Sequence, residues 1–208
     1  MGETRYIGRH NLVKRLAPLE GSPGRALYGD GSARFELEDT TLTVTPPFGL
    51  GHEADYEEVV VEPLLEALAE DHSVAALLVR LGGFAVGVFE GERLTDSKVG
   101  SRFVKGRHKK GGSSANRFRR RREEQERELI EEAAAEAARV LAPWQGRLDR
   151  IALGGDRDAV RRVLATRADL AWIEPLALER FFTVPEPRRR VLDELPYQLY
   201  AAKVVEQT

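Results

Sequence analysis

The sequence predicts a mixed α/β (α+β) protein, in which a mixed β-sheet with a central meander is flanked by helices. Segments typical of strands and of helices alternate along the chain, and three short strands joined by tight turns follow one another near its middle. Alternating elements place helices against a sheet, whereas consecutive short strands form an antiparallel meander. We therefore expect a sheet that is not strictly parallel, with helices on both faces.

Residues 1–55 are expected to form an N-terminal extension that packs on a main domain of residues 56–208. Near-helical spacing of apolar residues predicts a short helix in this extension, and alternation of apolar and polar residues predicts a hairpin. The helix is expected over about 11–19, and the strands over 33–38 and 41–45.

The main domain begins with a predicted helix and the three strands of the meander. The helix is expected over 56–70, and the strands over 74–80, 84–90 and 93–98. Two glycine-containing dipeptides, Gly82-Gly83 and Gly91-Glu92, separate the strands and are typical of two-residue hairpin turns.

A long helix is predicted next, over about 115–141, with Ser113 or Ser114 as its N-cap. Residues at near-helical spacing are expected to form its buried side: Phe118, Gln125, Leu129, Ala133, Ala137 and Val140. The elements expected after it are a strand over 147–153, a helix over 157–165, a short strand over 170–173 and a helix over 189–203 that Pro196 kinks or splits.

Composition excludes several classes of site. The chain has 208 residues, of which 42% are hydrophobic and 32% charged, so it is expected to be globular. It has no cysteine, which excludes disulfides and thiolate sites, and its four histidines show no metal-ligand spacing. No metal and no cofactor are expected. The apolar runs are too short to span a membrane, so we expect a cytoplasmic protein; no feature predicts its oligomeric state.

The charges are distributed unevenly. The stretch from Arg102 to Arg122 holds ten basic residues and no acidic one, whereas the rest of the chain holds 22 basic and 34 acidic residues. A basic segment on an acidic body favours nucleic acid in one orientation. The candidate RNA-binding residues are Lys98, Arg102, Lys105, Arg107, His108, Lys109, Lys110, Arg117, Arg119, Arg120, Arg121 and Arg122.

A glycine pair lies inside the basic segment. Gly111-Gly112 lets the backbone approach a ligand without Cβ contacts, and the start of the long helix behind it favours anions. Each feature also has a purely structural interpretation. A glycine pair is common in ordinary loops, and the arginines could pair along a solvated helix, as Arg119 with Glu123 and Arg120 with Glu124.

The motifs on both sides of this loop resemble the Vms-like release factor (VLRF) family, in particular its bacterial branch. They are Leu78-Val-Arg-Leu-Gly-Gly-Phe, Lys98-Val-Gly-Ser-Arg-Phe and Lys110-Gly-Gly-Ser-Ser-Ala-Asn-Arg-Phe-Arg-Arg-Arg-Arg. The resemblance is densest over 74–141 and continues through 149–182. It implies a fold like the central domain of class 1 peptide chain release factors, with a ribonuclease-H-like sheet.

The resemblance also implies a function at the ribosome. The expected activity is hydrolysis of the ester of peptidyl-tRNA in rescue of stalled large subunits, with peptidyl-tRNA and rRNA as partners. Relatives place a glutamine at the loop tip, and this chain has none there. The candidate catalytic residues are therefore Gly111, Gly112, Ser113, Ser114 and Asn116.

Our hypothesis is that a loop N–H donates to the developing oxyanion and that Ser114 or Asn116 places the attacking water. His108 is the titratable residue near the tip and is interpreted as a loop residue or a phosphate contact. Two alternatives stay open. One is a ribosome- or tRNA-binding quality-control factor without hydrolysis. The other is a small-molecule enzyme that uses the Gly154-Gly155-Asp156 turn.

Overall fold

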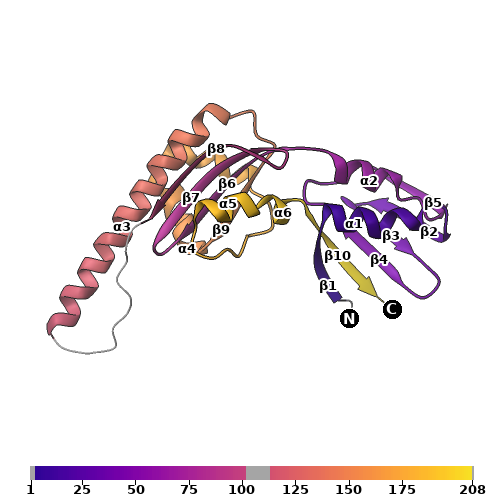
Figure 1. Ribbon diagram of the computed structural model, residues 1–208, viewed down its shortest axis with the longest axis horizontal. Coiled ribbons are helices and arrows are strands. Elements are labelled where there is room, and N and C mark those ends of the chain that lie inside the picture. The colour runs from indigo at the N-terminus through magenta and orange to yellow at the C-terminus, as the bar shows by residue number, and fades with distance from the viewer. Residues whose placement is uncertain (1–2, 102–112, 208) are drawn as a thin grey trace. The chain divides into compact units, whose positions relative to one another are not determined.

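The computed structural model describes residues 3–101 and 113–207, which form two compact units (Figure 1). Unit 1 comprises Met1–Asp71 together with Leu195–Thr208, and unit 2 comprises His72–Glu194. Each unit has its own β-sheet and its own buried core. The chain is thus a mixed α/β protein, as the sequence predicts.

Unit 1 is built on a six-stranded sheet in which all neighbouring strands are antiparallel. Its order is β1-β10-β4-β3-β2-β5. The strands are β1 (Glu3–Gly8), β2 (Pro23–Gly29), β3 (Ser32–Glu36), β4 (Thr41–Thr45), β5 (Ala54–Glu58) and β10 (Ala201–Gln207). Helices α1 (Arg9–Leu16) and α2 (Glu62–Ala69) contribute leucines to the same buried cluster as the strands.

Two segments expected to be helices differ from that expectation in unit 1. The hairpin of β3 and β4 is confirmed, but the helix expected over 56–70 begins only at Glu62. Residues 54–58 form β5 instead, because they pair with β2, with Tyr56 opposite Ala26. The expected boundary after residue 55 falls inside β5, and the unit also takes in the carboxyl terminus.

The carboxyl-terminal segment is the second difference. The helix expected over 189–203 is two short helices, α5 (Arg189–Glu194) and α6 (Pro196–Leu199), followed by strand β10. Proline ends the first helix, as expected from its missing amide donor. After it, Ala202 and Val204 are buried and Lys203 is exposed, which is the period of a strand. β10 pairs with β1 and β4 and so completes the sheet of unit 1.

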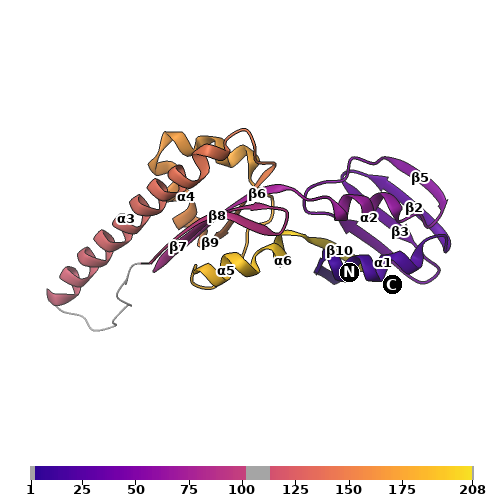
Figure 2. The same ribbon diagram turned by 45° about the horizontal axis from the view of Figure 1, so that its top comes forward.

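Unit 2 contains the predicted meander. The antiparallel strands β6 (Ser73–Arg80), β7 (Gly83–Glu90) and β8 (Arg93–Ser101) are joined by β9 (Arg150–Gly155), which is parallel to β6. Helices α3 (Ser113–Leu141) and α4 (Arg157–Thr166) contact one face of this mixed sheet, and α5 contacts the other (Figure 2). Arg80 pairs with Gly83, so the turn between β6 and β7 is Leu81-Gly82. The turn predicted from the sequence, Gly82-Gly83, lies one residue later.

The strand expected over 170–173 is wrong. These residues lie in a 3-10 helix, Ala168–Leu176. Leu170 and Ile173 are both buried, and their spacing of three residues matches one turn of such a helix. No regular strand of the described residues pairs with the outer edge of β9. Two isolated bridges form there instead, between Ile151 and Ala177 and between Gly154 and Phe182.

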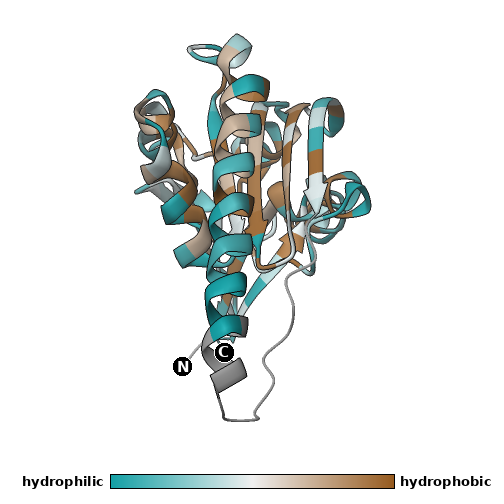
Figure 3. Ribbon diagram, turned by 90° about the vertical axis from the view of Figure 1, so that its left-hand side faces the viewer, coloured by the Kyte–Doolittle hydropathy of each residue, from teal (hydrophilic) through white to brown (hydrophobic). Residues whose placement is uncertain are grey.

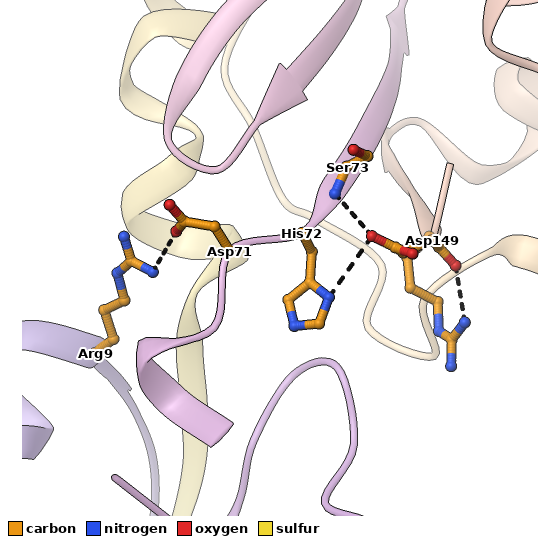
Figure 4. A network of polar contacts seen from close by, with 6 residues as sticks. Arg9, Asp71, His72, Ser73 and Asp149 are labelled. Carbon is orange, nitrogen blue, oxygen red and sulfur yellow. Dashed lines mark hydrogen bonds and ion pairs between the residues drawn. The ribbon is translucent and has the colours of Figure 1, made fainter. Parts of the chain in front are cut away.

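The chain first passes from unit 1 to unit 2 at Asp71 and His72, and each unit holds its own side of that connection by polar contacts (Figure 4). In unit 1, Arg9 Nη1 donates to Asp71 Oδ1 at 2.9 Å. In unit 2, Asp149 Oδ2 accepts from the Ser73 amide at 2.8 Å and lies 3.7 Å from His72 Nδ1. These contacts hold the start of β6 beside the start of β9.

Candidate functional site

The basic segment connects β8 to α3, and the structure describes its two flanks. Residues 102–112 lie outside the described residues. The predictions for Arg102, Lys105, Arg107, His108, Lys109, Lys110, Gly111 and Gly112 therefore stay predictions. The backbone of Ser113, Ser114 and Asn116 forms the first turn of α3. The glycine pair thus directly precedes a helix N-terminus, as the sequence predicts.

The point at which the segment leaves the sheet is fixed by two glycines. Ser101 ends β8 opposite Gly83. A Cβ atom on Gly83 would lie 2.9 Å from the carbonyl oxygen of Gly100, and a Cβ atom on Gly100 would overlap the ring of Phe84. Neither position can hold a larger side chain without a shift of its neighbours. This close packing explains why glycine occupies position 83 of the Gly82-Gly83 motif and position 100 of the Val99-Gly-Ser motif.

The amino-terminal end of α3 projects beyond the sheet of unit 2 (Figure 1). Among the described side chains of the helix, the first buried one is Leu129, and none between Arg117 and Glu128 is buried. Figure 3 shows hydrophilic residues along the coloured part of this end, and hydrophobic strands behind the opposite end of the helix. We call residues 113–124 the arm of α3. The buried positions expected at Leu129, Ala133, Ala137 and Val140 are confirmed.

The arm carries five arginines. The side chains of Arg117, Arg119, Arg120 and Arg121 are exposed, and that of Arg122 is half-buried. Arg119 Nε lies 3.7 Å from Glu123 Oε1, which confirms one of the two helix ion pairs expected from the sequence. Within the part of the chain that the structure describes, the other four arginines have no ion-pair partner. Pairing along the helix therefore accounts for only one of these cations.

This charge order works against the stability of the helix. The first turn of α3 has no acidic residue, although anions there interact favourably with the helix dipole. Arg117 and Arg121 are like charges four residues apart, a spacing that destabilises helices by about 0.2–0.5 kcal/mol per pair. The glutamates of the helix come only after these five arm arginines, at Glu123, Glu124, Glu126, Glu128, Glu131, Glu132 and Glu136. An external anion would relieve this repulsion.

Besides its buried apolar side, α3 forms ion pairs with other elements of unit 2. Arg162 of α4 forms an ion pair with Glu126, just after the arm. Lys98 Nζ of β8 lies 3.8 Å from Glu136 Oε1, far along the helix. The candidate residue Lys98 is therefore engaged on the sheet and is not gathered with the arm. The sequence gives no signal for either pair, because their members belong to separate elements.

The glutamine nearest to the glycine pair does not lie at the loop. Gln125 is twelve residues after Ser113, which corresponds to about 18 Å along the helix axis. Its Oε1 atom is buried and has no hydrogen-bond partner among the residues that the structure describes. Gln125 therefore cannot take the place of the glutamine that relatives have at the loop tip.

The Gly154-Gly155-Asp156 turn is used by the fold itself. Gly155 has a φ of +100°, and a Cβ atom there would overlap the carbonyl oxygen of Val79. The Asp156 amide donates to that same oxygen at 2.7 Å, and Asp156 Oδ1 accepts from the Ala159 amide at 2.9 Å as the N-cap of α4. These contacts explain the motif without a phosphate ligand, which disfavours the small-molecule alternative.

Over residues 3–101 and 113–207, no group of three or more histidine, aspartate or glutamate side chains could hold a metal ion. No helix in these ranges is long and apolar enough to cross a membrane.

Much of the chain matches a known protein family. A sequence model of the family described as the Actinobacteria/Chloroflexi VLRF1 release factor matches residues 72–205. This match covers all of unit 2, α6 and most of β10. It confirms the resemblance that the motifs on both sides of the basic loop indicate. No curated protein matches the chain.

Three solved structures illustrate the similarity of this chain to known proteins. An archaeal translation termination factor, aRF1, is 16% identical, with a TM-score of 0.46 over 77% of this chain and 49% of that one. The Vms1 mitochondrial localization core is 13% identical, with a TM-score of 0.46 over 93% and 80%. Archaeoglobus fulgidus Pelota is 11% identical, with a TM-score of 0.34 over 94% and 64%. The chain spans about half the length of the archaeal termination factor.

Proposed function

The chain belongs to the Actinobacteria/Chloroflexi VLRF1 release-factor family, and from this premise we propose that it rescues stalled ribosomes by cleaving the peptidyl-tRNA ester. It would act in the cytoplasm on the large subunit, with peptidyl-tRNA and rRNA as partners. The observation that carries the proposal is the arm of α3. Four of its five arginines lack an ion-pair partner among the described residues, and the arm follows directly on the basic loop with its glycine pair.

The charge of the two units supports binding through unit 2. Unit 1 has 15 acidic and 7 basic residues, a formal charge of −8, whereas unit 2 has 19 acidic and 25 basic residues, a formal charge of +6. Nucleic acid would be repelled by the first and attracted by the second. Because arginines pair with phosphates by displacing counterions, the affinity should fall steeply as salt rises.

The chemical step is assigned to the loop tip and the first turn of α3. Gly111 and Gly112 would let the backbone approach the ester, and the N–H groups of the loop and of Ser113 would donate to the developing oxyanion. Ser114 or Asn116 would orient the attacking water. Proximity and oxyanion stabilisation can lower the barrier without a strong general base, and the rRNA would supply the rest of the environment.

A second function is favoured by one observation. The chain has no glutamine at the tip, and Gln125 lies about 18 Å along α3 from Ser113. A factor that binds ribosomes or tRNA without cleaving the ester would need the cations but not the glycine pair. The two functions therefore differ in what a change at Gly111 and Gly112 does.

The test uses purified large subunits that carry labelled peptidyl-tRNA and follows peptide release. The first variant is Gly111→Ala/Gly112→Ala, and the second replaces Arg119, Arg120, Arg121 and Arg122 with glutamine. The matched control replaces Arg188, Arg189 and Arg190 with glutamine; these are exposed arginines of the same unit that pair with Glu186, Asp193 and Glu194.

Release that is lost in both variants and kept in the control is the expected result. Binding without release by the unmodified protein would favour the second function. Equal loss of release in the control would mean that overall positive charge, and not the arm, is responsible.

A further inference from the structure

The arginines of the arm surround α3 instead of forming one stripe. Residues eighteen apart lie on the same side of an α-helix, because each residue turns it by about 100°. Arg119 and Arg122 are thus in line with Ala137 and Val140, which are buried against the sheet. We call them the inner pair.

The other arginines lie on the opposite side. By the same spacing of eighteen residues, Arg117 is in line with Ala135 and Arg121 with Arg139, and both of these later residues are exposed. We call Arg117 and Arg121 the outer pair. Arg120 lies next to them, in line with the half-buried Ala138. Cations therefore point away from the axis on both sides of the arm.

The inner side is also open to a partner. The side chain of Arg119 is 62% exposed although its position continues the buried line of the helix. Arg122 is half-buried and none of the described side chains of the arm is buried, so the rest of unit 2 leaves this side at least partly open. A flat surface could meet only one side of a helix that is about 10 Å across.

We propose that the arm inserts into an RNA cleft whose phosphates contact the inner and the outer pair at once. This inference rests on the proposed ribosomal function and goes beyond it, because it specifies that RNA encloses the helix on two sides. Phosphates on one side would leave the other pair of arginines without a phosphate contact. Guanidinium groups match phosphate oxygens in two-point hydrogen bonds, which suits arginine better than lysine to this position.

The described side chains of the arm favour RNA over a protein partner. A helix that docks in a protein groove presents an apolar stripe at three- and four-residue spacing. Arg117 and the residues from Arg119 to Glu124 contain no apolar side chain. Enclosure by phosphates also accounts for a charge order that destabilises the free helix.

The test compares two double variants of the full chain in binding to large subunits at increasing salt. Arg119→Gln/Arg122→Gln removes the inner pair, and Arg117→Gln/Arg121→Gln removes the outer pair. The control is Arg161→Gln/Arg190→Gln, two exposed arginines outside α3 that pair with Asp158 and Glu194. Each arm variant should lower the slope of log affinity against log salt by about 1.4–1.8, which corresponds to two phosphates. The control should leave the slope unchanged.

Equal effects of the two arm variants support enclosure. A change of slope in only one of them would overturn it and indicate one-sided docking, while the proposed function would stand. Salt-independent binding by the unmodified protein would overturn both proposals. A photoreactive residue placed at 121 or at 122 gives the second measurement. RNA cross-links are expected from both positions, and a protein cross-link from either would overturn the inference.

Discussion

The ring of Phe84 occupies the space that a side chain on Gly100 would need. The two residues are opposite each other on β7 and β8, and a Cβ atom on Gly100 would overlap the Cε1 and Cζ atoms of the ring. Phe84 is fully buried in the core under α3. Because the basic loop leaves the sheet one residue later, this contact fixes where the candidate site begins.

Gly100→Ala should destabilise the protein by about 1–3 kcal/mol, because Phe84 cannot move without disturbing a packed core. Urea unfolding measures the change. Gly29→Ala is the control, since Gly29 is also a strand residue but has open space where its Cβ would be. An equal effect of the two substitutions would contradict the packing argument.

Asp156→Ala should cost about 1 kcal/mol, because it removes the N-cap of α4. Asp156→Asn should cost much less, since asparagine caps helices as well as aspartate does. Both variants should release peptide like the unmodified protein. Loss of activity without loss of stability would revive the small-molecule interpretation of this turn.

Arg121→Gln should make the free arm more helical while it weakens RNA binding. The change removes a like charge four residues from Arg117, and about 0.2–0.5 kcal/mol per pair corresponds to roughly twofold slower amide exchange in the arm. Exchange followed by mass spectrometry measures the first effect, and affinity for large subunits the second. Faster exchange in the variant would show that the arginines stabilise the arm by themselves.

Tyr28 should make stability depend on alkaline pH. Its hydroxyl donates to the Val60 carbonyl at 2.6 Å, and burial raises the pKa of Tyr28 well above its usual value. The unfolded chain therefore loses this proton first, at about pH 10, and the free energy of unfolding falls as the pH rises beyond that point.

Tyr28→Phe is the control for this pH dependence. It should lower stability at neutral pH by about 0.5–1.5 kcal/mol, because the hydrogen bond to the half-buried Val60 residue is lost. It should also flatten the decline above pH 10. A decline of the same size in both proteins would assign the effect to other groups.

Local signals in the sequence were sufficient for much of unit 2. The turn glycines and the apolar runs gave β6, β7 and β8 to within a few residues. The periodicity of Leu129, Ala133, Ala137 and Val140 gave the buried side of α3. Such features depend on neighbours a few residues away, so a short window of sequence contains them.

The candidate site was predictable in part. The unbalanced arginines and the glycine pair are visible in the sequence, and so is the helix that starts behind them. The exposure of both sides of the arm was not, because it depends on where the sheet of unit 2 ends beneath α3. The attachment of α3 by Arg162 and Glu126 likewise joins two helices that no local pattern connects.

By itself, the sequence determined the meander, the long helix, the basic segment and the family. Only the tertiary structure decided that the last strand, β10, pairs with the first strand, β1. β10 pairs with β1 across nearly the whole chain, and Tyr56 joins a sheet instead of a helix because β2 offers it an antiparallel partner. Strand pairing is a long-range choice that depends on which edges remain unpaired after the chain folds back, whereas turns and helix faces follow from residues that are close in sequence.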